Sequence, residues 1–305
     1  MADRDALLSL AGPVLGEYLD DTSATDILCN PNGSCFVRYL GQGKQERAHP
    51  GFQTLDTFLA RIAHEVGAEW LPTEPRLSAA LEDIGWRIQA ARPPVAPERW
   101  MALRKHPKHV FPLERLRDDG ILTGQQYAVL TRALLEGLRI VVGGGVGSAK
   151  TSLINSFLYF LRETLLRAFI AEDDPEVICL LKDHTREWRL KGGFGLREIV
   201  QDALRSDLDL LVIGELRGGE ALDMLTAFQT GHGGLTTVHC KTMEEIPLRI
   251  EELVLQVSQD PQRRMIRSVI DLLVHMRRTG TSWECTGIGT IEGWDGDQYV
   301  IRKVA

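Results

Sequence analysis

Short apolar runs alternate with helical stretches from about residue 108 onward. Two of these runs, Val141–Val142 and Leu210–Ile213, are apolar throughout, as expected of strands buried on both faces of a sheet. Such alternation predicts an α/β fold with a parallel sheet wound with helices. Functional side chains in this kind of fold lie at the carboxyl ends of the strands. The predicted strands are 138–142, 168–172, 177–181, 209–213, 235–239 and 272–276.

The first part of the chain has a different pattern. An amphipathic helix is predicted between Leu7 and Leu15, a short strand at Cys35–Tyr39 and a second helix near Leu55 to Val66. This mixture predicts a small α+β domain. The proline-bounded segment 106–112 suits a linker. We therefore predict an N-terminal domain over 1–107 and a larger α/β domain over 108–305.

Composition limits the classes of function. The 305 residues are 44% hydrophobic and 25% charged, which is enough for two globular domains with real cores. The net charge of −7 argues against a surface that coats nucleic acid, so no direct sequence-specific nucleic-acid binding is expected. The five cysteines are odd in number and contain no C-x-x-C pair, which supports neither a disulfide framework nor a zinc module.

Hydropathy predicts a cytoplasmic location. No apolar stretch approaches about 18 uninterrupted residues, the length of a membrane-spanning helix. The first residues, Met-Ala-Asp-Arg-Asp, do not resemble the charged start and apolar core of a secretory signal.

The glycine-rich segment 143–152 lies between a predicted strand and a helix-like stretch, where a phosphate-binding loop belongs. Counted from Gly144, its spacing matches G-x-x-x-x-G-K-[ST], except that Ala149 replaces the second glycine. In such loops backbone N–H groups surround the β-phosphate, the lysine ammonium reaches the β- and γ-oxygens, and the hydroxyl ligates Mg²⁺. The alternative is a structural glycine-rich turn. The predicted ATP-binding residues are Gly144, Gly145, Val146, Gly147, Ser148, Ala149, Lys150, Thr151 and Ser152, with Thr151 as the Mg²⁺ ligand.

Ala149 is the anomaly of this loop. A methyl group is expected to fit there only if the residue has negative φ and points away from the phosphate. Val146 offers no hydroxyl where a threonine could donate.

Carboxylates and histidines follow the other predicted strands. Glu215 ends the apolar strand 210–213, and Glu172 ends the strand before it, so both are candidates to position water or metal for catalysis. Either residue could instead be an ordinary solvated strand end. His232 and His239 flank strand 235–239 and are predicted sensors of the γ-phosphate or of a subunit interface, although lone histidines are more often satisfied polar residues.

Together these motifs resemble the secretion-ATPase superfamily, which shares a phosphate loop, an acidic box, a Gly-Glu strand end and a histidine box. Residues Gly214–Asp223 are similar to GEVRGGEALD and Thr230–His239 to TGHxGG…ATxH, both of the TrbB-like conjugal-transfer branch. A pilus-retraction or type II secretion motor is the same-fold alternative, which these boxes and the lack of a paired-cysteine zinc module disfavour.

The resemblance implies a RecA-like P-loop ATPase domain that forms a homohexamer and uses ATP and Mg²⁺. It further implies hydrolysis that drives substrate transfer or pilus assembly beside inner-membrane components of a type IV secretion or conjugation machine. Arg104, then Arg87, would close over the nucleotide from the first domain, and Arg217 would be a sensor or interface residue.

The chain departs from the family in its phosphate loop, typically GGTGSGKT, and in Asp207–Leu210, where the family has Arg-Pro-Asp-Arg. These departures leave open a slow enzyme or a nucleotide-binding scaffold with little hydrolysis.

Overall fold

The chain divides into two compact units, Met1–Lys108 and His109–Ala305. The computed structural model describes residues 9–40, 42–81, 85–105, 110–173, 175–188, 195–280 and 282–305. The predicted boundary at 107 and the first part of the predicted opening helix, including Leu7 and Leu8, lie outside the described residues.

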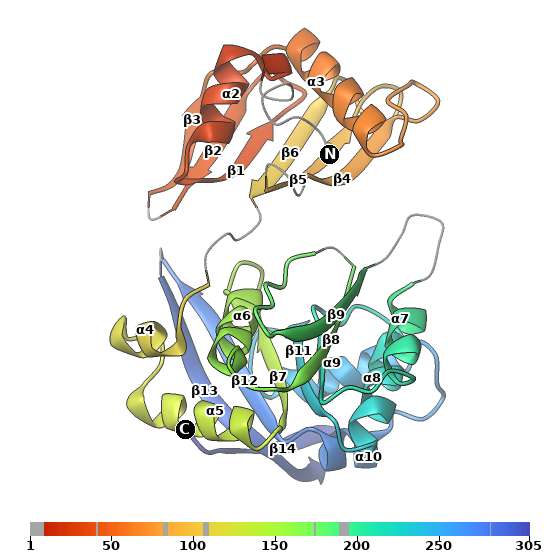
Figure 1. Cartoon of the computed structure of the whole chain (residues 1–305). Helices are drawn as coiled ribbons and strands as arrows, with labels where there is room; N and C mark the ends of the chain where they lie inside the picture. Colours follow the sequence, from red (N-terminus) through yellow and green to blue (C-terminus); the bar gives the residue numbers. More distant parts are fainter. Residues whose placement is uncertain are drawn as a thin grey trace. The chain divides into compact units, whose positions relative to one another are not determined.

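The first unit is a six-stranded antiparallel sheet with helices α2 and α3 packed on one face (Figure 1). The strand order is β3-β2-β1-β6-β5-β4. The predicted strand at 35–39 is confirmed as β2, and the predicted helix near 55–66 is confirmed as α3. The elements are α2 Gly12–Asp20, β1 Ala24–Cys29, β2 Cys35–Tyr39, β3 Gly43–Arg47, α3 Phe52–Glu65, β4 Arg76–Leu81, β5 Trp86–Ala91 and β6 Trp100–Lys105.

Alternation along the strands separates the two faces of this sheet. Ile27, Val37 and Leu103 pair side by side across three strands and are completely or almost completely buried beneath the helices. Residues one position along, such as Arg104, point to the other face, because successive side chains of a strand alternate. The first unit thus has its own core beneath the helices, and the other face of its sheet carries charged residues such as Arg104.

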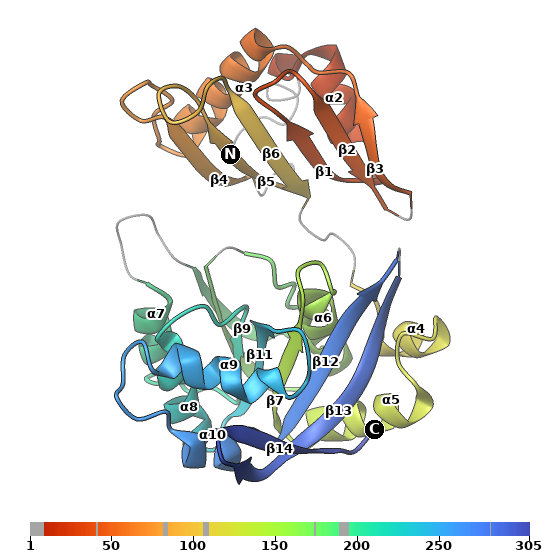
Figure 2. The same ribbon diagram turned by 180° about the vertical axis from the view of Figure 1, so that it is seen from behind.

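The second unit is an eight-stranded sheet with the order β14-β13-β12-β7-β11-β10-β8-β9. The six strands from β12 to β9 run parallel, and β13 and β14 continue the sheet antiparallel. Helices α4, α5 and α6 cover one face, while α7, α8, α9 and α10 cover the other (Figures 1 and 2). The strands are β7 Arg139–Gly144, β8 Arg167–Glu172, β9 Asp183–Trp188, β10 Leu210–Ile213, β11 Gly233–His239, β12 Leu272–Thr279, β13 Ser282–Asp295 and β14 Gln298–Lys303. The helices are α4 Leu113–Asp118, α5 Gly124–Leu135, α6 Lys150–Leu161, α7 Leu196–Ala203, α8 Glu220–Gln229, α9 Glu245–Val254 and α10 Arg263–Val269.

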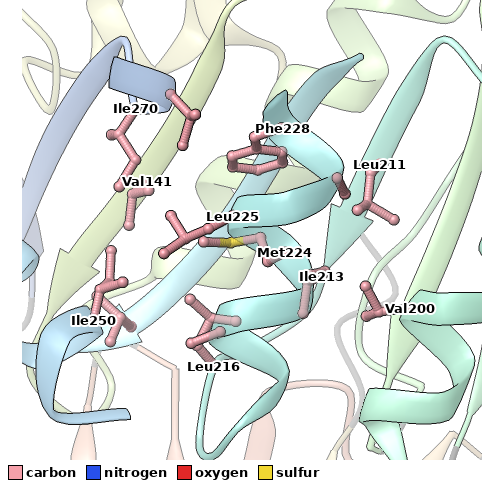
Figure 3. Packing of buried hydrophobic residues seen from close by; sticks show 14 of the residues in the cluster. Val141, Val200, Leu211, Ile213, Leu216, Met224, Leu225, Phe228, Ile250 and Ile270 are labelled. Atoms are coloured by element: carbon pink, nitrogen blue, oxygen red, sulfur yellow. The ribbon is translucent and has the colours of Figure 1, made fainter. Parts of the chain in front are cut away.

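Helix α8 forms the centre of the core on the second face. Its Leu225 and Phe228 lie against the sheet near Val141 of β7 and Leu211 of β10, with Ile250 of α9 close by (Figure 3). All five side chains are buried, and each buried side chain of this size contributes about 1.5–3 kcal/mol relative to exposure. This packing fixes the strands whose carboxyl ends carry the candidate site.

The α/β fold with a smaller α+β unit is confirmed, as are five of the six predicted strands. The prediction of a strand at 177–181 is wrong, because no strand covers those residues and the edge strand is β9 instead. Side chains satisfy the backbone there: Val177 N–H donates to Glu172 and Ile178 N–H donates to Asn155. Strands β13 and β14 lie beyond the last predicted strand.

No helix in the described part of the chain is both long enough and apolar enough to span a bilayer.

Candidate active site

The glycine-rich loop connects the end of β7 to the start of α6, as the sequence indicates. At Gly144 a Cβ would lie 2.3 Å from the carbonyl oxygen of Met276 and 2.5 Å from Oγ of Ser148, so a side chain cannot fit. Gly147 has φ of 69°, in the left-handed region that favours glycine. The loop therefore combines a close backbone approach to β12 with a sharp turn before the helix.

Ala149 does not meet the condition expected for a methyl group in this loop, a negative φ. Its φ and ψ are 66° and 28°, a left-handed conformation, at the position directly before α6. This is the backbone shape that the glycine of G-x-x-x-x-G-K-[ST] supplies without strain, and an L-residue there costs roughly 1–2 kcal/mol. The loop thus keeps the geometry of the motif while holding a strained residue. Val146, the other departure, has 78% of its side chain exposed.

Lys150 is buried in the loop and folded toward it. Its Nζ donates to the carbonyl oxygens of Gly144 and Gly145, both at 3.0 Å, and lies 3.1 Å from Nδ1 of His239. Burial lowers the pKa of Lys150, and the nearby carboxylate of Glu215 opposes that shift. An ammonium can only donate, so His239 accepts at Nδ1 and carries its proton at Nε2. Burial, followed by the Lys150 charge, lowers the pKa of His239, in keeping with a neutral ring.

His239, at the end of β11, lies between Lys150, which follows β7, and the carboxylate of Glu215, which follows β10. Nε2 of His239 lies 2.6 Å from Oε1 of Glu215. Arg217 binds the other oxygen of Glu215, with Nη2 at 2.6 Å and Nε at 2.9 Å, and its Nη1 lies 3.5 Å from Asp173. Lys150, His239, Glu215 and Arg217 thus form one continuous polar chain at the carboxyl edge of β7, β11 and β10.

Glu172 lies at the end of β8, beside Gly214 of the neighbouring strand. Its side chain is 2% exposed, and its Oε1 accepts from the backbone N–H groups of Glu176, at 2.9 Å, and Val177, at 2.7 Å. Burial raises the pKa of Glu172 to about 7, although those N–H groups and Arg186, 3.8 Å away, favour the charged form. A carboxyl group of this pKa changes its charge near neutral pH.

Three of the predicted residues lie on other elements. His232 precedes β11, at the opposite end of that strand from His239 and about 20 Å away, and its predicted role as a γ-phosphate sensor stays a prediction. Its predicted role at a subunit interface stays a prediction. Arg104 and Arg87 face one another on β6 and β5 in the first unit, with Arg104 3.6 Å from Asp26, and their predicted reach to nucleotide stays a prediction.

Several contacts were not predicted from the sequence. Asp173 accepts a hydrogen bond from Arg217, and Arg186 forms an ion pair with Glu172. Trp283 on β13 donates from Nε1 to the carbonyl oxygen of Gly147 at 3.0 Å. The acidic run after β8 was the only sequence signal for Asp173, and no motif identifies Trp283.

The residues present suit a magnesium nucleotide. Oγ of Ser148 is buried in the loop without a hydrogen-bond partner among the described residues. Within that same part of the chain no side chain caps the amino end of α6, so its first N–H groups face the loop. Such N–H groups with a lysine ammonium form an anion site suited to phosphate. Thr151, in the first turn of α6, has the hydroxyl that a Mg²⁺ ion prefers.

Fold and site together define a RecA-like P-loop ATPase domain, with the loop strand between β12 and β11 and the carboxylates on β10 and β8. The chain belongs to the Type II/IV secretion system protein family, whose family model matches residues 10–285. The resemblance to the TrbB-like secretion ATPases is confirmed.

Relatives and solved structures agree with this assignment. The probable conjugal transfer protein TrbB of Sinorhizobium fredii (strain NBRC 101917 / NGR234) is 29% identical over 295 residues, which cover 96% of this chain and 90% of that protein. The VirB11 ATPase of the Brucella suis type IV secretion system, solved in complex with sulphate, is 25% identical with a TM-score of 0.51, covering 93% of this chain and 96% of that one. The Legionella pneumophila ATPase DotB has a TM-score of 0.65 at 18% identity, covering 92% and 78%, and shows the fold alone.

Proposed function

We propose that this protein binds ATP with Mg²⁺ and hydrolyses it to power a type IV secretion or conjugation machine. The observation that carries the proposal is the polar chain from Lys150 through His239 to Glu215 and Arg217, assembled from three strand ends around a phosphate loop. A purely structural glycine-rich turn has no need for a buried lysine that a histidine connects to a carboxylate two strands away.

Each residue of the loop has a distinct task in this proposal. The N–H groups of the loop and of the first turn of α6 bind the β-phosphate. Lys150 exchanges its present contacts with Gly144, Gly145 and His239 for the β- and γ-phosphate oxygens, which are stronger acceptors. Thr151 holds Mg²⁺, which when bound neutralises phosphate charge.

The carboxylates act on the attacking water. Two hydrogen bonds from Arg217 fix the direction of Glu215, whose other oxygen lies beside His239, and we assign Glu215 to orient the water toward the γ-phosphate. Glu172 is a second candidate, because its pKa of about 7 suits a group that takes up a proton near neutral pH. His239, released from Lys150, can report the γ-phosphate to the carboxylate.

The family supports a proposal for assembly and location. We propose a homohexamer in which Arg104 and Arg87 of the first unit close over the nucleotide, at the cytoplasmic face of the inner membrane beside membrane components of the machine. Relatives named for conjugal transfer and type IV secretion support this setting. Light scattering with nucleotide should give a mass near six times 34.0 kDa. A persistent monomer with full ATPase activity would contradict the ring.

A nucleotide-binding scaffold with little hydrolysis is the second candidate, and the left-handed Ala149 favours it. Strain at the residue before Lys150 can misplace the lysine in the transition state while leaving binding intact. Steady-state phosphate release with and without Mg²⁺, measured beside nucleotide binding, separates the two candidates. Mg²⁺-dependent turnover supports the motor, and binding without turnover supports the scaffold.

A further inference from the structure

The hairpin of β12 and β13 contacts the phosphate loop from the side opposite to Glu215. Trp283 Nε1 donates to the carbonyl oxygen of Gly147 at 3.0 Å, across 136 positions of sequence. On β12, the Met276 carbonyl oxygen would lie 2.3 Å from a Cβ on Gly144, and Nη1 of Arg278 would lie 3.6 Å from a Cβ on Gly147. The hairpin therefore bounds the loop from Gly144 to Gly147.

External support matters for this loop because its backbone holds a strained residue. Gly147 and Ala149, two residues apart, are both left-handed. Within the turn, Ser148 N–H donates to Gly145 at 3.3 Å, a long bond. A strained backbone persists only where surrounding structure holds it in place.

We infer that Trp283 is a positioning residue that holds the phosphate loop in its binding shape and offsets the strain at Ala149. The inference rests on the proposed function and names a residue outside every motif of the site. The half-buried indole packs on the core beside α6 and directs its only donor to Gly147. Its N–H fixes the carbonyl of the Gly147–Ser148 peptide, which limits how far the backbone can relax one peptide before the strained alanine.

A double-mutant cycle tests this coupling. Trp283→Phe keeps an aromatic ring and removes the donor, while Ala149→Gly removes the strain. We expect Trp283→Phe to weaken binding of Mg·ADP, measured by calorimetry, about fivefold, the equivalent of one neutral hydrogen bond. In the Ala149→Gly background the same change should cost about twofold or less, because a relaxed loop needs less support. The matched control is Trp294→Phe, in the same strand, whose side chain is 38% exposed.

Hydrogen exchange of the nucleotide-free protein provides a readout that does not depend on binding. Amides 145–150 should exchange faster in Trp283→Phe than in the parent or in Trp294→Phe, while amides of β10 stay unchanged. Equal exchange at 145–150 in all three proteins would overturn the inference. The inference would also be overturned if Trp283→Phe weakened Mg·ADP binding by the same factor in the parent and in the Ala149→Gly background. A parent that binds no Mg·ADP would instead defeat the proposed function, and the exchange result would still decide the role of Trp283.

Discussion

Nδ1 of His239 lies 3.1 Å from Nζ of Lys150, and the pairing of β11 with β7 produces this contact by placing His239 opposite Gly144. The histidine box and the phosphate loop are therefore parts of one site. The contact also requires a neutral imidazole that accepts at Nδ1, which leaves Nε2–H to face Glu215, 2.6 Å away. A change in the position or charge of Lys150 can therefore act on Glu215 through the imidazole ring of His239.

Removing the lysine ammonium should abolish turnover. Lys150→Ala deletes the only ammonium known to lie in the described loop, and charge-assisted bonds to phosphate have no substitute among backbone N–H groups. We expect loss of ATPase activity and weaker Mg·ATP binding, measured by phosphate release and calorimetry. Lys182→Ala, at an exposed position outside the site, is the control. If Lys150→Ala hydrolyses ATP like the parent, the site lies elsewhere.

Neutralising Glu215 should separate binding from chemistry. Glu215→Gln keeps the shape of the side chain and removes the charge that Arg217 and His239 hold. ATP should still bind, while kcat falls by roughly 10²-fold or more, the scale of losing a general base. Glu252→Gln, an exposed ion-pair partner of Arg249, should leave both quantities unchanged. Equal losses of binding and rate would indicate a structural role for Glu215.

Glu172 should make the protein less stable as pH rises. Its pKa is raised in the folded state to about 7 from a usual value of 4.5, so between these values the folded protein binds more protons than the unfolded chain. The free energy of unfolding therefore falls as pH increases from about 4.5 to about 7, by up to ~3 kcal/mol for a shift of this size.

Urea unfolding at pH 5 and pH 8 checks this, with Glu172→Gln as the variant. The glutamine oxygen still accepts from the N–H groups of Glu176 and Val177 but carries no charge. The free energy of unfolding of the variant, relative to that of the parent, should therefore be higher at pH 8 than at pH 5. Glu163→Gln, at an exposed carboxylate, should follow the parent. An identical pH slope in Glu172→Gln would contradict buried ionisation of this group.

Local signals predicted the parts of the site that follow strands directly in sequence. Lys150, Glu215 and His239 each lie within a few residues of an apolar run, so parallel topology alone brings them to one edge. Trp283 reaches the loop only because β13 folds back antiparallel on β12, a tertiary event that no spacing encodes.

Two errors have similar causes. The apolar run 177–181 has the composition of a strand, but Glu172 and Asn155 take its amide bonds and leave the sheet edge to β9. The φ of Ala149 depends on how the loop closes against β12, so the rule that an alanine fits there only with negative φ, which rests on residue type alone, is wrong. Both were decided by contacts between segments far apart in the chain.

Ala149→Gly should stabilise the protein, although glycine usually destabilises the start of a helix. A left-handed backbone conformation destabilises the folded state of an alanine by roughly 1–2 kcal/mol, and glycine removes that strain. Glycine also raises the entropy of the unfolded chain, which costs about 0.4–1 kcal/mol of stability. The variant should therefore be more stable than the parent by about 0.5–1 kcal/mol. If the relaxed loop also places Lys150 better, kcat/KM should rise by up to about fivefold, the equivalent of ~1 kcal/mol in transition-state stabilisation.

The matched control is Ala128→Gly, at an exposed position inside α5, where helical backbone favours alanine and the substitution should cost about 0.8–1 kcal/mol. Urea unfolding of both variants should therefore shift in opposite directions from the parent. A loss of stability in Ala149→Gly comparable to that of Ala128→Gly would mean that residue 149 is not strained, because only a left-handed position reverses the sign of an alanine-to-glycine change.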